Sequence, residues 1–144
     1  MHAAFDGEGA RIRGGRWNPE GTAVVYTSST LALATLEALV HVKPHNFGDD
    51  LVAVAADIPE RLGRSVIRLG DLRSDWQVHP PPGELADIGA EWLRQARTAV
   101  LIAPSAIIPQ ESNYLLSPRH PDFGRIKIQA PIPFRFDQRL WKTP

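Results

Sequence analysis

No cysteine occurs among the 144 residues of this sequence, which excludes disulfide bonds, thiolate zinc sites and cysteine nucleophiles. The sequence also lacks an apolar run of the roughly 18 residues that a membrane-spanning helix needs. It shows no basic-then-apolar leader with a small-residue cleavage site either. These absences predict a cytoplasmic protein that is neither secreted nor anchored in a membrane.

A net charge is lacking as well, because 16 basic residues balance 16 acidic ones. Non-specific binding of nucleic acid needs a strong positive field, so the balance argues against that class of protein. The charge is unevenly distributed, however, since residues 113–144 carry a net +4 and the rest of the chain −4. This basic end fits an acidic partner or a solvated surface, and it keeps an RNA-targeting function open as the alternative.

Lysine is scarce, because 13 of the 16 basic residues are arginines. The planar arginine fork suits phosphate and carboxylate groups, so the bias is compatible with a phosphate-rich ligand, although a GC-rich genome produces the same bias. Histidine pairs that could bind a metal are also lacking. The one pair at a suitable spacing, His41 and His45, is interrupted by Pro44 and cannot share a helix face. We therefore expect no metal site.

What the sequence does have is a 43% share of apolar residues, enough for the core of one folded domain. Two helices are predicted, one running from a Ser29 or Thr30 cap to about Val42 and an amphipathic one over 84–97. The glycine-rich opening is predicted to be a loop. Helices so few and so irregularly placed indicate a single α+β domain rather than a doubly wound parallel sheet. Short strands are predicted over 23–27, 51–58, 65–69, 99–103, 125–129 and 133–137.

The first segment with chemical potential is Gly14–Gly21, GGRWNPEG. Its glycines let the backbone approach a ligand closely, and Arg16 offers a fork for phosphate. Trp17 and Asn18 add a flat aromatic face and an amide. A plain turn with one anchoring tryptophan is the alternative interpretation.

Glu37 is the only residue charged at pH 7 between Ser29 and Val42, and it shares a helix face with apolar residues. A carboxylate in that position either faces a polar cavity or pairs with an arginine. Tyr26 and Ser28 end the preceding strand, and ligand clefts form where a strand ends and a helix begins. A core position is the alternative for Tyr26.

A third segment, PSAIIPQESNY, follows the strand predicted over 99–103. Ser105 lacks the Gly-x-Ser-x-Gly elbow of a serine nucleophile, which favours a hydrogen-bonding role for its hydroxyl. Asn113 adds an amide that can donate and accept. His120, between prolines, is expected to be a structural loop residue rather than a base.

Together these segments resemble the RES domain, the toxin half of Xre–RES toxin–antitoxin modules. The matching stretches occur in the order that the family shows, and they span most of residues 1–144. The Arg, Glu and Ser that give the family its name correspond here to Arg16, Glu37 and Ser105. The stretches that carry the resemblance are GEGARIRGGRWNPEGTAVVYTSSTLALATLEALVH, PSAIIPQESN, HPDF and FRFDQRL.

The resemblance implies an α+β fold like that of the ADP-ribosyltransferase toxins, with an NAD cleft between two sheets. It implies cleavage of NAD with transfer of ADP-ribose to phosphate, water or a protein side chain, and an Xre-type antitoxin as partner. In this scheme Glu37 stabilises the ribosyl cation, Arg16 holds phosphate and Tyr26 covers the pyridinium. The substrate-binding residues implied are Trp17, Asn18, Ser28, Ser105 and Asn113.

One family feature is not matched. RES domains usually begin with an aromatic–Arg strand before the glycine-rich loop, whereas this sequence starts MHAAF and has no such arginine there. The resemblance therefore predicts a RES domain over 1–144 in which either that strand lies outside the given sequence or one phosphate-binding arginine is missing. A catalytically idle interaction module is the further alternative that this difference leaves open.

Overall fold

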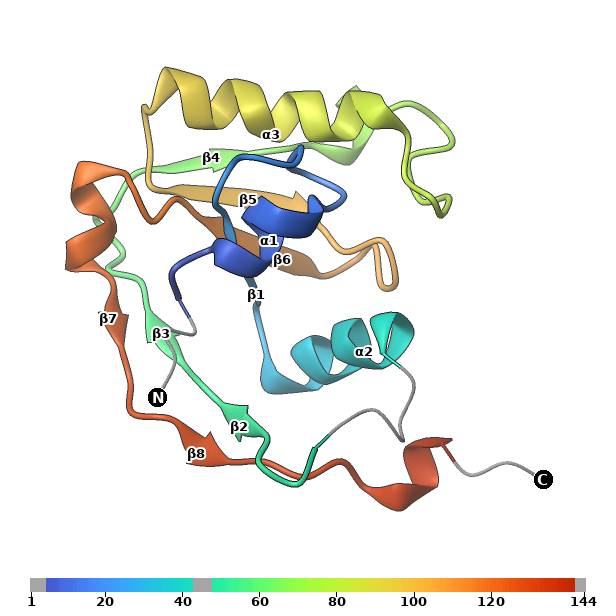
Figure 1. Ribbon diagram of the computed structural model, residues 1–144. Coiled ribbons are helices and arrows are strands. Elements are labelled where there is room, and N and C mark those ends of the chain that lie inside the picture. Colours follow the sequence, from blue (N-terminus) through green and yellow to red (C-terminus); the bar gives the residue numbers. More distant parts are fainter. Residues whose placement is uncertain (1–4, 43–47, 142–144) are drawn as a thin grey trace.

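A mixed four-stranded sheet forms the centre of the computed structural model, which describes residues 5–42 and 48–141 (Figure 1). The strand order is β1-β6-β5-β4, in which β1, β6 and β5 are antiparallel and β4 runs parallel to β5. The strands are β1 (Val25–Ser28), β4 (Arg64–Val66), β5 (Val100–Pro104) and β6 (Ser112–Leu116).

Two helices flank this sheet, as the sequence predicted. Thr30 caps α2 (Leu31–His41) by accepting a hydrogen bond from the Leu33 N–H at 3.1 Å. The amphipathic α3 (Gly83–Gln95) lies along one face of the sheet (Figure 1). The described chain also contains three short 3-10 helices: η2 (Leu69–Asp71), η3 (Pro121–Arg125) and η4 (Gln138–Trp141).

The opening of the chain is not the loop that its glycines predict. Residues 8–13 form a short helix, α1 (Glu8–Arg13), whose end is closed by a hydrogen bond from Gly14 N to Ala10 O. Arg11 and Glu8 lie one turn apart on this helix and stabilise it with an ion pair of 2.8 Å. Gly7 and Gly14 flank the helix with φ of 74° and 72°, in the region that favours glycine.

Away from the central sheet, the chain forms two short ribbons, one after the other (Figure 1). They pair β2 (Val52–Ala53) with β8 (Ile132–Pro133), and β3 (Ala56–Asp57) with β7 (Lys127–Ile128). The single buried strand predicted over 51–58 is therefore wrong. A two-stranded ribbon cannot bury both of its faces, and Val52 is 44% exposed.

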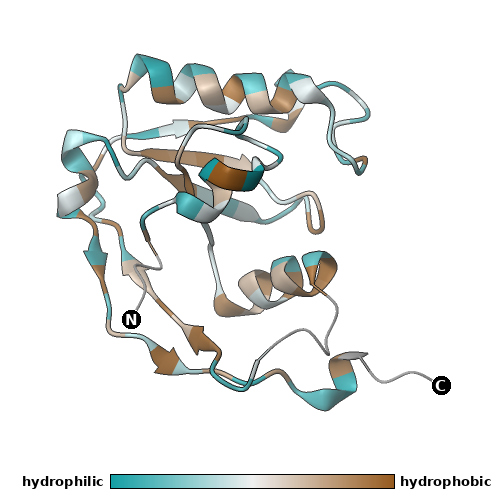
Figure 2. Cartoon of the chain, in the orientation of Figure 1, coloured by the Kyte–Doolittle hydropathy of each residue, from teal (hydrophilic) through white to brown (hydrophobic). Residues whose placement is uncertain are grey.

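The core lies on both faces of the central sheet, because neighbouring side chains along a strand point to opposite sides. On β5, Leu101 and Ala103 pack toward α3, while Val100 packs on the opposite face. In Figure 2, β5 is mostly hydrophobic, whereas α3 carries both hydrophilic and hydrophobic residues. The predicted fold class, a single α+β domain with mixed sheets and two main helices, is confirmed.

Candidate active site

Glu37 projects from α2 to the ends of two central strands, where its Oε2 accepts two hydrogen bonds. One comes from the Ser105 hydroxyl at 3.2 Å and the other from the Asn113 amide Nδ2. Ser105 directly follows β5, and Asn113 lies in β6. In the described part of the chain Glu37 therefore faces a polar cluster and is held by neutral donors.

The donors themselves are fixed by further hydrogen bonds. Ser105 is fully buried, and its Oγ accepts from the backbone N–H groups of Ile107 and Ile108, both at 3.1 Å. The β1–β6 register places Ser28 opposite Asn113, and the Ser28 hydroxyl donates to Asn113 Oδ1 at 2.8 Å. Each polar atom around the carboxylate thus has a defined orientation.

Tyr26 lies two residues before Ser28, on the same face of β1. Its hydroxyl donates to Asn18 Oδ1 at 2.6 Å and accepts from the Trp17 N–H at 3.2 Å. Burial of this hydroxyl raises the Tyr26 pKa, yet 40% of the residue is exposed. The hydroxyl end is therefore buried while the ring is open to solvent, so Tyr26 is not the core residue that the sequence also allowed.

The glycine-rich loop packs against the hydroxyl end of Tyr26. A Cβ at Gly15 would lie 2.8 Å from the Tyr26 hydroxyl oxygen, so only glycine leaves room for the tyrosine. Asn18 is 1% exposed, and its Nδ2 donates to three backbone carbonyls, those of Ala10, Pro19 and Thr22. Trp17, 2% exposed, packs in the core against Trp76, as the anchoring-tryptophan interpretation expected.

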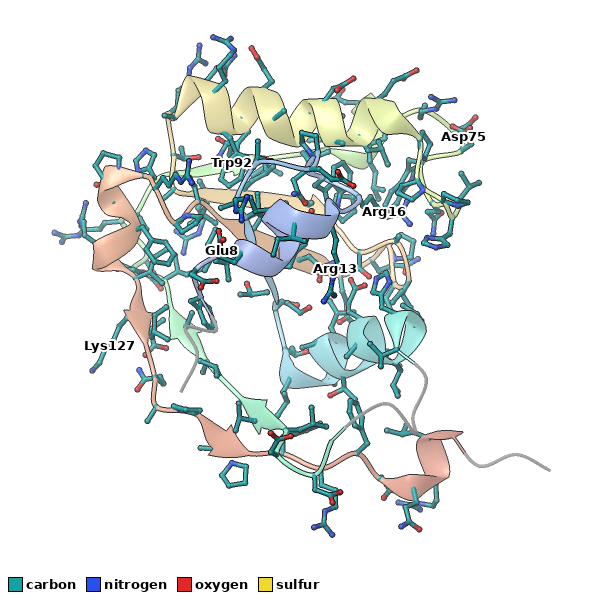
Figure 3. All side chains as sticks on the ribbon, viewed as in Figure 1. Glu8, Arg13, Arg16, Asp75, Trp92 and Lys127 are labelled. Carbon is teal, nitrogen blue, oxygen red and sulfur yellow. The ribbon has the colours of Figure 1, made fainter. Side chains whose placement is uncertain are left out.

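Arg16 points from this loop to the segment that precedes α3 (Figure 3). Its NH1 donates to the carbonyl oxygens of Trp76, at 2.6 Å, and Val78, at 3.1 Å. Partial burial lowers the pKa of Arg16 below its ordinary value, and the negative charge of Glu37 offsets only part of this shift. Both of these Arg16 bonds go to main-chain carbonyls, and no ion pair between Arg16 and Glu37 is found in the described chain.

A cleft of about 940 Å³ runs along the free edge of β1, between residues 26–31 and the ribbon residues 50–56. Phe5, Tyr114 and Ile132 add apolar lining, and Arg64 and Asp50 add charge. The cleft shares Tyr26 and Ser28 with the surroundings of Glu37, whereas Glu37 itself does not line it. No group of three metal-ligating side chains is found among the described residues.

The comparison with known families decides what this arrangement belongs to, since the RES domain matches residues 1–137. The chain belongs to the RES-domain family of toxins. It is 37% identical over 138 residues to the Prs ADP-ribosylating toxin of Sphingobium sp. strain YBL2, covering 94% of this chain and 86% of that protein. It is 36% identical over 144 residues to Toxin Res of Photorhabdus laumondii, covering 99% and 92% of the two chains. The resemblance read from the sequence is therefore confirmed.

Sequence reasoning missed part of the surroundings of this RES site. The carbonyls of Trp76 and Val78 hold Arg16, yet every residue has a carbonyl, so no side-chain pattern announces them. His120, for which the sequence predicted a structural role, caps η3: its side chain is buried, its Nδ1 accepts from the Asp122 N–H, and its Nε2 lies 2.8 Å from Ala96 O. None of the helices in residues 5–42 and 48–141 is long and apolar enough to cross a membrane.

Proposed function

We propose that this chain is a toxin that cleaves the nicotinamide–ribose bond of NAD and transfers the ADP-ribose to an acceptor. The observation that carries this proposal is the Glu37 carboxylate, which the neutral side chains of Ser105 and Asn113 hold in a defined position. Membership of the RES family supports it, and so does the similarity to the Sphingobium protein, which is named an ADP-ribosylating toxin.

The reaction needs a fixed negative charge more than it needs an acid. When the C–N bond breaks, its electron pair goes to the nicotinamide nitrogen, so the leaving group departs neutral and without protonation. The positive charge moves to the ribose as an oxocarbenium-like cation, which a nearby carboxylate stabilises. Because Ser105 and Asn113 are neutral, they fix Glu37 without cancelling the charge that the cation requires.

The other site residues fit the remaining parts of NAD. The exposed ring of Tyr26 offers its face to the pyridinium. The Nε–NH2 edge of Arg16, which bonds to no described residue, offers a fork to the diphosphate. The cleft beside Tyr26 and Ser28 provides the space for the rest of the ADP-ribose. Trp17 and Asn18 are buried, so we assign them the role of holding Arg16 and Tyr26 in place.

The acceptor completes the reaction by bonding to the ribose C1′ and losing a proton. Inorganic phosphate, water and a protein side chain are the acceptor classes that the family resemblance implies. A toxin of this kind would deplete the NAD of its own cell, so we expect a cognate Xre-type antitoxin as partner. The net +4 of residues 113–144 suits an acidic segment of that partner.

The test is to incubate the protein with NAD, with and without inorganic phosphate, and to follow free nicotinamide and the ribosylated product. The Glu37→Gln variant, purified identically, controls for contaminating enzymes. Nicotinamide release by the wild type alone supports the proposal, and the product identifies the acceptor. Release by neither protein, or degradation of added RNA instead, would contradict it.

A further inference from the structure

The segment Trp76–His79, which we call the strap, lies against Arg16, the turn after β5 and the end of α2. Its carbonyls at Trp76 and Val78 accept hydrogen bonds from Arg16 NH1. Its Gln77 Nε2 donates to the carbonyl of Ala106 at 3.0 Å. The His79 ring lies 6.4 Å from the ring of His41 at the end of α2. Figure 1 shows this loop beside the β5–β6 turn and above the end of α2.

The strap is anchored in the core at one end only. Trp76 is 6% exposed and packs against Trp17, whereas Gln77, Val78 and His79 are exposed. Packing does not hold Val78 in place, because 49% of the residue is exposed to solvent. The position of the Val78 carbonyl therefore depends on polar contacts. These include the bond from the Val78 N–H to the Asp75 carbonyl, at 3.2 Å, and the bond from the neighbouring Gln77 to Ala106.

Ala106 belongs to the turn that also holds the Glu37 cluster. It directly follows Ser105, and the next two N–H groups, of Ile107 and Ile108, donate to the Ser105 hydroxyl. Gln77 thus joins the loop that holds Arg16 to the turn that holds the donor of Glu37. This side-chain bond is one of the links that fix Arg16 relative to Glu37, beside the bond of Arg16 to the carbonyl of the buried Trp76.

The strap also decides which part of Arg16 remains available. Two carbonyls occupy NH1, so a ligand can be met by the edge formed by Nε and NH2. A guanidinium is planar and rigid, so fixing one nitrogen fixes the direction of the opposite edge. If the free end of the strap moved, the Val78 bond would be lost and the Trp76 carbonyl alone would hold Arg16, which would let that edge turn.

From these contacts we infer that Gln77 is a positioning residue for Arg16, which it keeps aimed at the diphosphate of the substrate by tying the strap to Ala106. This inference rests on the proposed function for the identity of the ligand. It concerns binding more than bond cleavage, because Arg16 meets the diphosphate while Glu37 faces the ribose.

The experiment compares Gln77→Met, which keeps the length and loses the donor, with Gln77→Lys, which keeps a donor. Loss of one positioning hydrogen bond should raise the KM for NAD by about five- to tenfold and leave kcat within about twofold. Gln77→Lys should stay close to wild type. Gln110→Met is the matched control, since Gln110 is exposed in the neighbouring turn and its side chain bonds to no described residue.

A double-substitution cycle separates positioning from general stability. Binding of NAD is measured by calorimetry in the Glu37→Gln background, with and without Arg16→Ala. Gln77→Met should weaken binding only while Arg16 is present. An unchanged KM in Gln77→Met, or an equal loss with and without Arg16, would overturn the inference.

A readout without NAD keeps this inference separate from the proposed function. The Arg16 Nε–H signal in a nitrogen-15 NMR spectrum should exchange faster with solvent in Gln77→Met than in the wild type. An unaltered signal would overturn the positioning role whatever the substrate is. A wild type that positions Arg16 in this way but releases no nicotinamide would instead contradict the proposed function alone.

Discussion

Asn113 donates a hydrogen bond from its side-chain amide to the carboxylate of Glu37, which lies 76 positions earlier in the chain. Strand pairing sets the direction of this bond, because Ser28 stands opposite Asn113 and donates to its Oδ1. The amide nitrogen is therefore turned to Glu37. A carboxylate held by a neutral amide keeps its full charge for a cationic ligand, which an arginine partner would not allow.

The first prediction is that Glu37→Gln strongly slows turnover and leaves the protein folded. The glutamine oxygen can still accept from Ser105 and Asn113, so the hydrogen-bond network persists while the charge is lost. Removing one such electrostatic contact should slow nicotinamide release by about 100- to 1,000-fold. Thermal unfolding, measured alongside, should remain close to wild type, and a rate within tenfold of wild type would rule out the assigned role.

Asn113→Asp tests whether the holding group must be a neutral donor. The aspartate keeps the size but replaces the donor with a second carboxylate beside Glu37, which repels it. We expect kcat/KM for NAD to fall by about 10- to 100-fold at pH 7, the value of one hydrogen bond to a charged group. Ser28→Ala removes only the bond to Asn113 Oδ1, so its effect should be several times smaller. An equal fall in kcat/KM for Asn113→Asp and Ser28→Ala would contradict the prediction that Glu37 depends mainly on the neutral donor of Asn113.

Gly15→Ala should disable the site by displacing Tyr26. The added Cβ would lie 2.8 Å from the Tyr26 oxygen and 2.9 Å from Asn18 Oδ1, and Asn18 is too buried to move freely. We expect a loss of stability of about 1–3 kcal/mol and a clear loss of turnover. Gly9→Ala, in the exposed face of α1, meets no atom within 4 Å and should be neutral or slightly stabilising. Urea unfolding measures the free energy of unfolding of both variants. A Gly15→Ala protein as stable and as active as the wild type would contradict this prediction.

Local chemistry explains which elements the sequence predicted correctly. The cap and apolar spacing of α2 are properties of neighbouring residues, and Thr30 caps it as expected. The helix α1 was missed because part of its support comes from outside, from the Asn18 side chain bonded to the Ala10 carbonyl. The strand β6 was missed because it opens with Ser112 and Asn113, two polar residues whose place in the sheet serves the site.

The candidate site was predictable to the extent that its chemistry is carried by side chains. A lone carboxylate on an apolar helix pointed to Glu37, and the structure places Ser105, Asn113 and Ser28 in one hydrogen-bonded chain with it. Their roles toward NAD stay predictions. The strap could not be foreseen, because main-chain carbonyls 60 and 62 residues away hold Arg16.

Arg16→Lys should weaken the binding of NAD although the charge is retained. A lysine ammonium can replace the bonds to the strap carbonyls but offers no second edge to the diphosphate. We expect about a tenfold rise in the dissociation constant, measured by calorimetry in the Glu37→Gln background to prevent turnover. Arg61→Lys, at an exposed position outside the site, serves as the control. The same affinity in all three proteins would show that Arg16 makes no forked contact.

The last prediction concerns stability at alkaline pH. Burial of the Tyr26 hydroxyl raises its pKa above the ordinary value of 10.0. Above that pH the phenol of the unfolded chain ionises while that of the folded protein keeps its proton. The unfolded state then binds fewer protons, so the free energy of unfolding falls as the pH rises further.

Tyr26→Phe removes this contribution, and it also removes the bonds to Asn18 and Trp17, at a cost of about 1–3 kcal/mol at neutral pH. The wild type should therefore be more stable than the variant at pH 7, and the difference should narrow above pH 10. Urea unfolding of both proteins across this range measures it. In the control variant Tyr114→Phe, which leaves Tyr26 in place, the free energy of unfolding should still fall above pH 10 because of Tyr26, whereas in Tyr26→Phe this contribution is absent. A stability difference between wild type and Tyr26→Phe that stays constant with pH would mean that the Tyr26 hydroxyl is open to solvent in the folded protein. The conclusion that this hydroxyl is buried would then be wrong.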